Sequence, residues 1–195
     1  MSEREDSVLS SVDGQVGRIT LNRPEKRNSL NSAVILGIKS ALRGIGSNRD
    51  VRAIVITGAG KDFCSGADLS ELQKISNASV ADNSDDANSL LELFLNIRQC
   101  EVPVIAAVRG RALAGGCGLA TACDLVLASS TARFGYPEVK IGFVPAIVLA
   151  ILRRNVSEKR AFELITRGEE ISAEVAERIG LVNQVFSDEN FDQEV

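Results

Sequence analysis

Two glycine-containing stretches carry the residue types best suited to chemistry in this sequence. Gly66-Ala67-Asp68 and Gly115-Gly116 each follow an apolar run and lead into a predicted helix, near Leu69 and near Cys117. The first turn of a helix presents unpaired N–H groups and a positive dipole end, and glycine lets a ligand approach the backbone closely. Two such termini facing each other would direct two N–H donors at one oxygen and stabilise an enolate. Either stretch alone is also consistent with simple close packing of a helix on a strand.

Histidine is absent from the sequence. Its absence excludes Ser-His-Asp and Cys-His nucleophile systems and any metal site built on histidine. Acid–base chemistry must therefore use Asp, Glu, Lys, Tyr or Cys. The four cysteines form no CxxC pair, so we expect reduced, buried thiols rather than a disulfide framework. Because no cluster of carboxylates is evident either, we expect no metal.

Length and charge limit the class of protein. A chain of 195 residues suits one domain, residues 1–195. The net charge of −4 argues against a nucleic-acid partner or a basic membrane surface. The longest apolar run, Gly142–Leu152, contains Pro145 and is too short to cross a bilayer. Since the charged start "MSEREDSV" lacks the apolar region of a signal peptide, we expect a cytoplasmic protein.

Alternating strand and helix patterns must position these residues. Apolar runs at Val8–Val12 and Gln15–Leu21, joined by Asp13-Gly14, predict a hairpin. Further strands are predicted at Val51–Gly58, Val102–Gly110, Leu125–Ser129 and Val182–Phe186. Helices are predicted after Asn31 or Ser32 and at Asn88–Gln99, Ala146–Arg154, Ser157–Thr166 and Ser172–Ile179. We expect the polar stretch Ser76–Asp86 to be exposed and mobile. This alternation is typical of an α/β fold with parallel pairing.

Several motifs in order resemble the enoyl-CoA hydratase/isomerase (crotonase) family. They are "LNRPEKRNSLN", "KDFCSGADL", the continuous stretch "VPVIAAVRGRALAGGCGLATACDLVLASSTARFGYPEVKIGFVP" and the ending "AERIGLVNQV". The resemblance runs from about Val8 to Phe186. It implies a spiral of ββα units with parallel sheets. It also implies further carboxyl-terminal helices through which family members form trimers or hexamers. The given sequence lacks them, so we expect weak association and exposed apolar surface.

The resemblance also assigns roles to the two stretches. The N–H groups of Ala67 and Gly115 would form the oxyanion hole for the carbonyl of an acyl-CoA thioester. Gly66, Asp68, Leu69 and Gly116 would line the substrate site, and backbone near Ala67 would contact the adenine end of coenzyme A. Lys26 and Arg27 would bind the coenzyme A phosphates, although each also suits a solvated loop. Coenzyme A would enter as part of the substrate, with no permanently bound cofactor.

Hydratases of the family that this sequence resembles have two glutamates that activate a water molecule, and only one of them is present here. Glu138, in "FGYPE", matches the second glutamate, whereas Gly118 stands where the first is expected. Glycine in a helix costs about 1 kcal/mol relative to alanine, so Gly118 could make room for substrate or reflect relaxed packing. Hydration needs a water held by more than one group. Shifting a double bond needs one base, which Glu138 could provide.

Several nearby side chains have a structural interpretation beside the functional one. Asp68 and Asp124 suit helix caps and loop hydrogen bonds. Cys64 and Cys117 flank the proposed hole but lack a histidine to activate them. Tyr136 could line the acyl pocket or simply pack.

The hypothesis is an enoyl-CoA hydratase or isomerase that acts through a thioester enolate, with Glu138 as the proton shuttle. The alternative is a catalytically degenerate acyl-CoA-binding or scaffolding protein that keeps the fold. A serine peptidase of related spiral fold is excluded by the absence of histidine.

Overall fold

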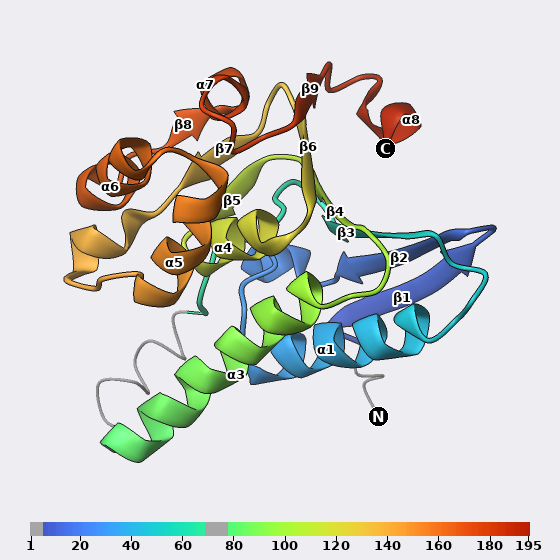
Figure 1. Cartoon of the computed structure of the whole chain (residues 1–195), viewed down its shortest axis with the longest axis horizontal. Coiled ribbons are helices and arrows are strands. Elements are labelled where there is room, and N and C mark those ends of the chain that lie inside the picture. The colour runs from blue at the N-terminus through green and yellow to red at the C-terminus, as the bar shows by residue number, and fades with distance from the viewer. Residues whose placement is uncertain (1–5, 69–77) are drawn as a thin grey trace.

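The computed structural model describes residues 6–68 and 78–195 (Figure 1). Its strands are β1 (Val8–Asp13), β2 (Val16–Leu21), β3 (Ala53–Gly58), β4 (Val104–Val108), β5 (Arg111–Leu113), β6 (Leu125–Ser129), β7 (Arg133–Gly135), β8 (Ile171–Ser172) and β9 (Gln184–Phe186). Its α-helices are α1 (Ser32–Gly46), α3 (Val80–Arg98), α4 (Gly115–Ala122), α5 (Ala146–Asn155), α6 (Glu158–Arg167), α7 (Ala173–Arg178) and α8 (Phe191–Glu194). Two 3₁₀ helices, η1 and η2, span Pro24–Lys26 and Pro137–Ile141.

The strands form a large sheet and a small one. The large sheet has the order β1-β2-β3-β4-β6-β9, and every pair except β1–β2 is parallel. The small sheet has the order β5-β7-β8, with β5 parallel to β7. Each of β4 and β6 is followed at once by a short strand of the small sheet. The predicted α/β spiral of strand–strand–helix units is therefore confirmed.

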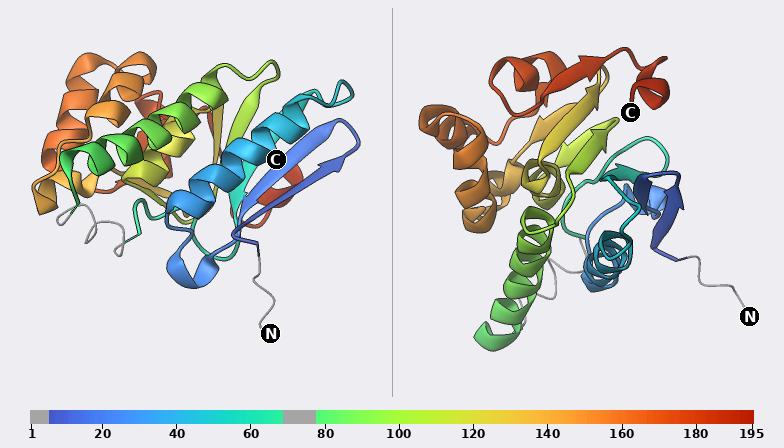
Figure 2. Two further views of the ribbon diagram at one scale, coloured as in Figure 1. Left: turned by 90° about the horizontal axis from the view of Figure 1, so that it is seen from below. Right: turned by 45° about the vertical axis from the view of Figure 1, so that its right-hand side comes forward.

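Helices cover the large sheet on one side and gather round the small sheet at one end. Helix α1 packs on β1 and β2, and α3 lies beside α1 (Figures 1 and 2). Helices α5, α6 and α7 lie near the small sheet, and α8 lies apart from them beyond β9 (Figure 1). Apolar side chains of α1, α3 and α4 meet those of the large sheet in one continuous core. This core holds the ends of β3 and β4 in fixed positions.

Local signals explain most element boundaries. The Asp13-Gly14 turn joins β1 and β2 in antiparallel register, with Gly14 at φ 55°. The side chain of Asn31 caps α1 by accepting a hydrogen bond from Val34 N–H. Gly168 ends α6 in the left-handed conformation. These features agree with the sequence-based predictions.

The predicted bounds of two elements differ from those in the structure. Helix α3 begins at Val80, so it includes most of the polar stretch Ser76–Asp86 that precedes the helix predicted at Asn88–Gln99. Ser79 and Asp82 form a reciprocal capping box, and this S-x-x-D signal outweighs the polar composition. The long strand expected at Val102–Gly110 ends at Val108, and β5 and β7 were not predicted, because strands of three residues leave little periodic signal.

Within residues 6–68 and 78–195, no helix is long and apolar enough to cross a membrane. Over the same residues, no group of three or more Cys, Asp or Glu side chains is placed to hold a metal ion.

Candidate active site

The first glycine stretch belongs to the loop that follows β3. Leu30 N–H donates to the carbonyl oxygen of Gly66 at 2.7 Å, and Asp68 N–H donates to the carbonyl oxygen of Leu30 at 2.9 Å. Ala67 and Leu30 thus form a parallel β-bridge, in which the carbonyl group of Gly66 and the N–H group of Asp68 face Leu30. The N–H group of Ala67 itself therefore points to the opposite side. Among the described residues, that N–H has no acceptor.

The second stretch begins α4, and the residue before it, Ala114, has a strained backbone conformation that sets the direction of the helix start. Ala114 N–H donates to the carbonyl oxygen of Gly135 at 2.8 Å, which ties the turn to β7. Ala114 has φ 50° and ψ −129°, a conformation that non-glycine residues adopt at a cost of about 1–3 kcal/mol. Gly115 follows as the first helical residue, and its N–H also has no acceptor in the described chain. Helix α4 thus presents a free N-terminal donor.

The two stretches touch each other. A β-carbon placed on Gly66 would lie 2.7 Å from Ala114 Cβ and 3.4 Å from Gly115 N. Gly66 has φ 92°, so both its conformation and its surroundings require glycine. Cys64 pairs with Ala112 in the adjacent bridge and keeps the two loops in register. The structure therefore places the loop that contains Ala67 against the start of α4 at Gly115, at the carboxyl edge of the sheet.

Glu138 lies in η2 with an unsatisfied oxygen. Its Oε2 atom is buried and has no hydrogen-bond partner among the described residues. Burial raises the pKa of the Glu138 carboxyl above its ordinary value of 4.5. A half-buried carboxyl with a raised pKa and a buried, unpartnered oxygen is suited to accept and return a proton.

Tyr136 connects Glu138 to α4. The hydroxyl of Tyr136 lies 2.7 Å from that of Thr121, and the side chain is fully buried. Thr121 lies one helical turn beyond Cys117, and the charge of Glu138 contributes to raising the pKa of Cys117. Tyr136, two residues before Glu138, therefore attaches the start of η2 to the last turn of α4. Because the Tyr136 hydroxyl already has a partner, this geometry gives it a packing role and does not add to the predicted substrate contact.

The thiols beside the amides are inert. Burial raises the pKa of Cys64 and of Cys117 to about 12, so both stay protonated at neutral pH. Gly116 is buried, and a β-carbon on it would lie 2.7 Å from Cys64 Sγ. Gly116 therefore packs closely against Cys64, and a role for Gly116 in lining the substrate site stays a prediction.

Gly118 does not leave open space. A β-carbon on Gly118 would lie 2.7 Å from Val148 Cγ2 and 3.2 Å from Phe94 Cζ. The expectation that this glycine makes room for substrate is therefore wrong for this conformation. Helices α3 and α5 pack against α4 there, and sequence alone could not show this long-range contact.

The predicted acidic residues outside η2 are paired. Asp68 forms an ion pair with Arg23 at 3.0 Å and accepts a hydrogen bond from Ser29 Oγ. Asp124 accepts a hydrogen bond from Val104 N–H at 2.9 Å. Both arrangements agree with the structural interpretation. Leu69 lies outside the described residues.

The loop of η1 lies against the first stretch. Ser65 N–H donates to the carbonyl oxygen of Arg27 at 3.0 Å. The side chains of Lys26 and Arg27 are exposed, and neither forms an ion pair with a described residue. Asn28, which sequence analysis missed, is buried and donates to the carbonyl oxygens of Ala59 and Asp62. Asn28 adopts a left-handed φ of 53°, and asparagine is one of the few residue types that tolerate this conformation. An asparagine within a predicted loop was therefore the available sequence signal.

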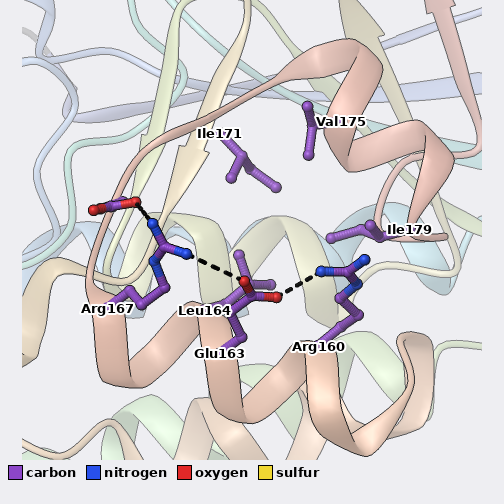
Figure 3. Close-up of a pocket in the computed structure, with 8 residues that line it drawn as sticks. Arg160, Glu163, Leu164, Arg167, Ile171, Val175 and Ile179 are labelled. Atoms are coloured by element: carbon purple, nitrogen blue, oxygen red, sulfur yellow. Dashed lines mark hydrogen bonds and ion pairs between the residues drawn. The ribbon is translucent and has the colours of Figure 1, made fainter.

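The cavities found in the described chain lie elsewhere. One, of about 230 Å³, is framed by Arg160, Glu163 and Arg167 of α6 over an apolar floor that includes Ile171 and Val175 (Figure 3). Glu163 pairs with both arginines, and Glu169 also pairs with Arg167. The arginines are therefore neutralised, and this cavity contains none of the predicted site residues.

Comparisons with known proteins place the chain in a family. A family model described as enoyl-CoA hydratase/isomerase matches residues 11–195. A Thermus thermophilus protein named as an enoyl-CoA hydratase is 44% identical over 172 residues, which cover 88% of this chain and 68% of the relative. The short-chain-enoyl-CoA hydratase of Clostridium acetobutylicum is 39% identical, over 92% of this chain and 69% of the relative. This chain spans 61% of the length of a Dictyostelium discoideum relative.

Solved structures of enoyl-CoA hydratases have the same fold as this chain. The enoyl-CoA hydratase of Mycobacterium smegmatis superposes with a TM-score of 0.93 at 35% identity, over 97% of this chain and 74% of that one. A Legionella pneumophila enoyl-CoA hydratase/isomerase, or crotonase, gives a TM-score of 0.94 at 33% identity, over 97% of this chain and 73% of that one. This chain belongs to the enoyl-CoA hydratase/isomerase family of enzymes.

Proposed function

We propose that this protein acts on an enoyl-CoA thioester through an enolate, with Glu138 as the proton shuttle. The close approach of Gly66 to Ala114 and Gly115 carries the proposal, in which the free N–H groups of Ala67 and Gly115 converge on one oxygen atom. A thioester oxygen placed between these amides receives two hydrogen bonds that strengthen as its negative charge develops. The similarity to proteins named as enoyl-CoA hydratases supports the substrate class.

The proton transfer follows from the position of Glu138. Its Oε2 takes a proton from a carbon of the acyl chain, and the electron pair of the broken C–H bond moves to the thioester oxygen. Returning the proton to a different carbon shifts the double bond. In hydration Glu138 would instead take a proton from a water molecule whose oxygen bonds to the β-carbon of the enoyl group, the electron pair of the C=C bond would move to the thioester oxygen, and the proton would be returned to the α-carbon. The raised pKa of Glu138 favours both uptake and return of the proton near neutral pH.

The exposed cations near the first stretch suit the other end of the substrate. Lys26 and Arg27 have no ion-pair partner in the described chain, and their loop is bonded to Ser65. Phosphate groups of coenzyme A would neutralise them.

A matched pair of variants at Gly115 tests the proposal. Proline is tolerated at the first position of a helix and replaces the N–H under test by a ring carbon. Alanine keeps that N–H, and its β-carbon would lie 3.4 Å from Leu30 Cδ1. We expect Gly115→Pro to lose about 10²–10³-fold in kcat and Gly115→Ala to stay close to the wild type. Activity is measured for hydration of crotonyl-CoA and for isomerisation of a 3-enoyl-CoA.

Folding of each variant is checked by circular dichroism and thermal unfolding. Equal activity of a folded Gly115→Pro variant would contradict the amide clamp. Binding of coenzyme A thioesters without turnover by the wild type would support the alternative of a catalytically degenerate acyl-CoA-binding protein.

A further inference from the structure

The N–H group of Ala67 lies in a segment with no polar side chain of its own to fix it. Gly66 has no side chain, and Ala67 has a single methyl group. The carbonyl oxygen of Gly66 accepts from Leu30 N–H at 2.7 Å, and Asp68 N–H donates to the carbonyl oxygen of Leu30 at 2.9 Å. Asp68 is therefore the residue next to Ala67 whose polar side chain can hold this peptide in place.

Arg23 holds that side chain and the Leu30 segment at the same time. Its Nη2 donates to Asp68 Oδ2 at 3.0 Å, and its Nη1 donates to the carbonyl oxygen of Ser29 at 3.0 Å. Ser29 Oγ also donates to Asp68 Oδ2, at 3.3 Å. Because Ser29 directly precedes Leu30, one planar guanidinium connects both sides of the bridge that orients the Ala67 N–H.

This ion pair is largely shielded from water. The side chain of Arg23 is 18% exposed and that of Asp68 is 13% exposed, against 56% and 40% for the Arg160–Glu163 pair on α6. Exposed ion pairs contribute little, whereas removal of one partner from a shielded pair leaves the other charge uncompensated. Arg23 is also held through its backbone, because its N–H donates to the side-chain oxygen of the buried Asn28 at 2.9 Å. The pair is therefore able to fix the geometry of the Ala67 segment.

We propose that Arg23 is a positioning residue, which keeps the Ala67 N–H aimed at the thioester oxygen through its ion pair with Asp68. The inference rests on the proposed enolate chemistry, in which that N–H is one of two donors to the oxygen. In this role Arg23 and Asp68 touch no reacting atom. Misplacement of a catalytic group by about 1 Å can cost about 10²-fold in rate. A hydrogen bond that strengthens as charge develops acts on kcat more than on KM, so loss of the pair should lower kcat and leave KM nearly unchanged.

Variants of the pair provide the kinetic test. Arg23→Met removes the guanidinium and keeps an unbranched side chain, and Asp68→Asn removes the charge and keeps the shape. We expect each to lose about 10–100-fold in kcat for the enoyl-CoA that the wild type turns over, with KM within about threefold. The double variant should lose no more than the worse single variant, because both changes break one interaction. Arg109→Ala is the matched control, since it breaks an ion pair of the same 3.0 Å length with Asp188 and should keep kcat within a few-fold.

The carbonyl stretching band of a bound thioester separates positioning from stability. Butyryl-CoA, labelled with a heavy carbon isotope at its carbonyl, is saturated and is neither hydrated nor isomerised. Hydrogen bonds to its carbonyl oxygen lower the frequency of this infrared band. We expect a red shift in the wild type and in Arg109→Ala, and a smaller one in Arg23→Met and Asp68→Asn. Gly115→Pro, which lacks one donor outright, gives the reference for a lost hydrogen bond.

A third variant keeps the test decisive if Arg23→Met or Asp68→Asn does not fold. Arg23→Lys keeps the charge beside Asp68 but lacks the planar fork that also reaches Ser29, so its red shift should fall between those of the wild type and Gly115→Pro. A wild-type red shift in every folded variant of the pair, or a loss of kcat that leaves the red shift unchanged, would overturn the positioning role. Absence of any red shift in the wild type would instead overturn the convergence of the two amides on which this inference rests.

Discussion

Two carboxylates of this chain lie in contrasting surroundings. Asp188, which follows β9, accepts hydrogen bonds from Arg109 Nε at 3.0 Å and from the hydroxyls of Ser129 and Thr131. These donors lower its pKa. Glu138 has a buried oxygen with no partner among the described residues, and burial raises its pKa.

The difference separates a group that holds the fold together from one that is available for chemistry. The Asp188 cluster joins the segments after β4, β6 and β9, and Arg109 also lies over the ring of Phe191 at 5.2 Å, which attaches α8. Glu138 makes no comparable contribution, and its unsatisfied oxygen costs stability. A fold retains such a group where the cost is compensated elsewhere, as at an active site.

Removal of the Glu138 charge should give the largest effect on activity. Glu138→Gln keeps the shape of the side chain but cannot shuttle a proton, so we expect turnover of the preferred enoyl-CoA to fall about 10²–10⁴-fold. The free energy of unfolding should not fall, since no hydrogen bond of Oε2 is lost. Steady-state kinetics and denaturant unfolding measure the two quantities.

Asp188→Asn is the matched control for that variant. It changes a carboxylate of equal charge that is fully paired, and its turnover should stay within a few-fold of the wild type while its stability falls. Equal losses of turnover in both variants would remove the distinction between the two carboxylates.

The sequence predicted the architecture well, because the main elements carry strong local signals. The Asp13-Gly14 turn, the apolar strand Ala53–Gly58 and the capping residue Asn31 each act within a few residues. The short strands β5 and β7 depend on pairing with each other across the chain. They left no usable local pattern and were not predicted.

The two glycine stretches and Glu138 were also identified as candidates from the sequence and the family resemblance. Their surroundings were not predicted. Ala114 adopts a positive φ without being glycine, so its residue type gave no warning. The space at Gly118 is filled by Val148 and Phe94, which reach it only through the packing of three helices.

The same contrast between paired and unpaired charges is found among the basic side chains. Arg109 is paired with Asp188 and Asp192, whereas Lys26 and Arg27 are exposed and have no ion pair in the described chain. We expect the double variant Lys26→Ala/Arg27→Ala to raise KM for an acyl-CoA by about tenfold, with little change in kcat. The effect should shrink at high salt, because exposed charges are screened. A KM independent of both residues would assign phosphate binding elsewhere.

Loss of Arg109 should reduce stability and leave catalysis intact. Arg109→Ala removes the ring contact with Phe191, worth about 0.5–1 kcal/mol at an exposed site, and leaves Asp188 with fewer donors. We therefore expect a lower thermal midpoint, with kcat within a few-fold of the wild type. Arg109→Lys keeps the charge but not the paired geometry, so it should recover only part of the loss. A large loss of kcat in a folded variant would show that the cluster reaches the active site.

The two carboxylates should also differ in how they link stability to pH. The pKa of Glu138 is raised in the folded state, so the folded protein binds more protons than the unfolded chain as pH rises above 4.5. The contribution of Glu138 to the free energy of unfolding therefore decreases as pH rises above 4.5.

Asp188 has the opposite dependence. Its pKa is lowered, so its contribution to the free energy of unfolding is present above pH 3.8 and is lost as pH falls below that value. Denaturant unfolding across this pH range, for the wild type, Glu138→Gln and Asp188→Asn, measures both slopes. Relative to wild type, Glu138→Gln should gain stability as pH rises and Asp188→Asn should lose it, and slopes of the same sign would contradict the opposite environments of the two groups.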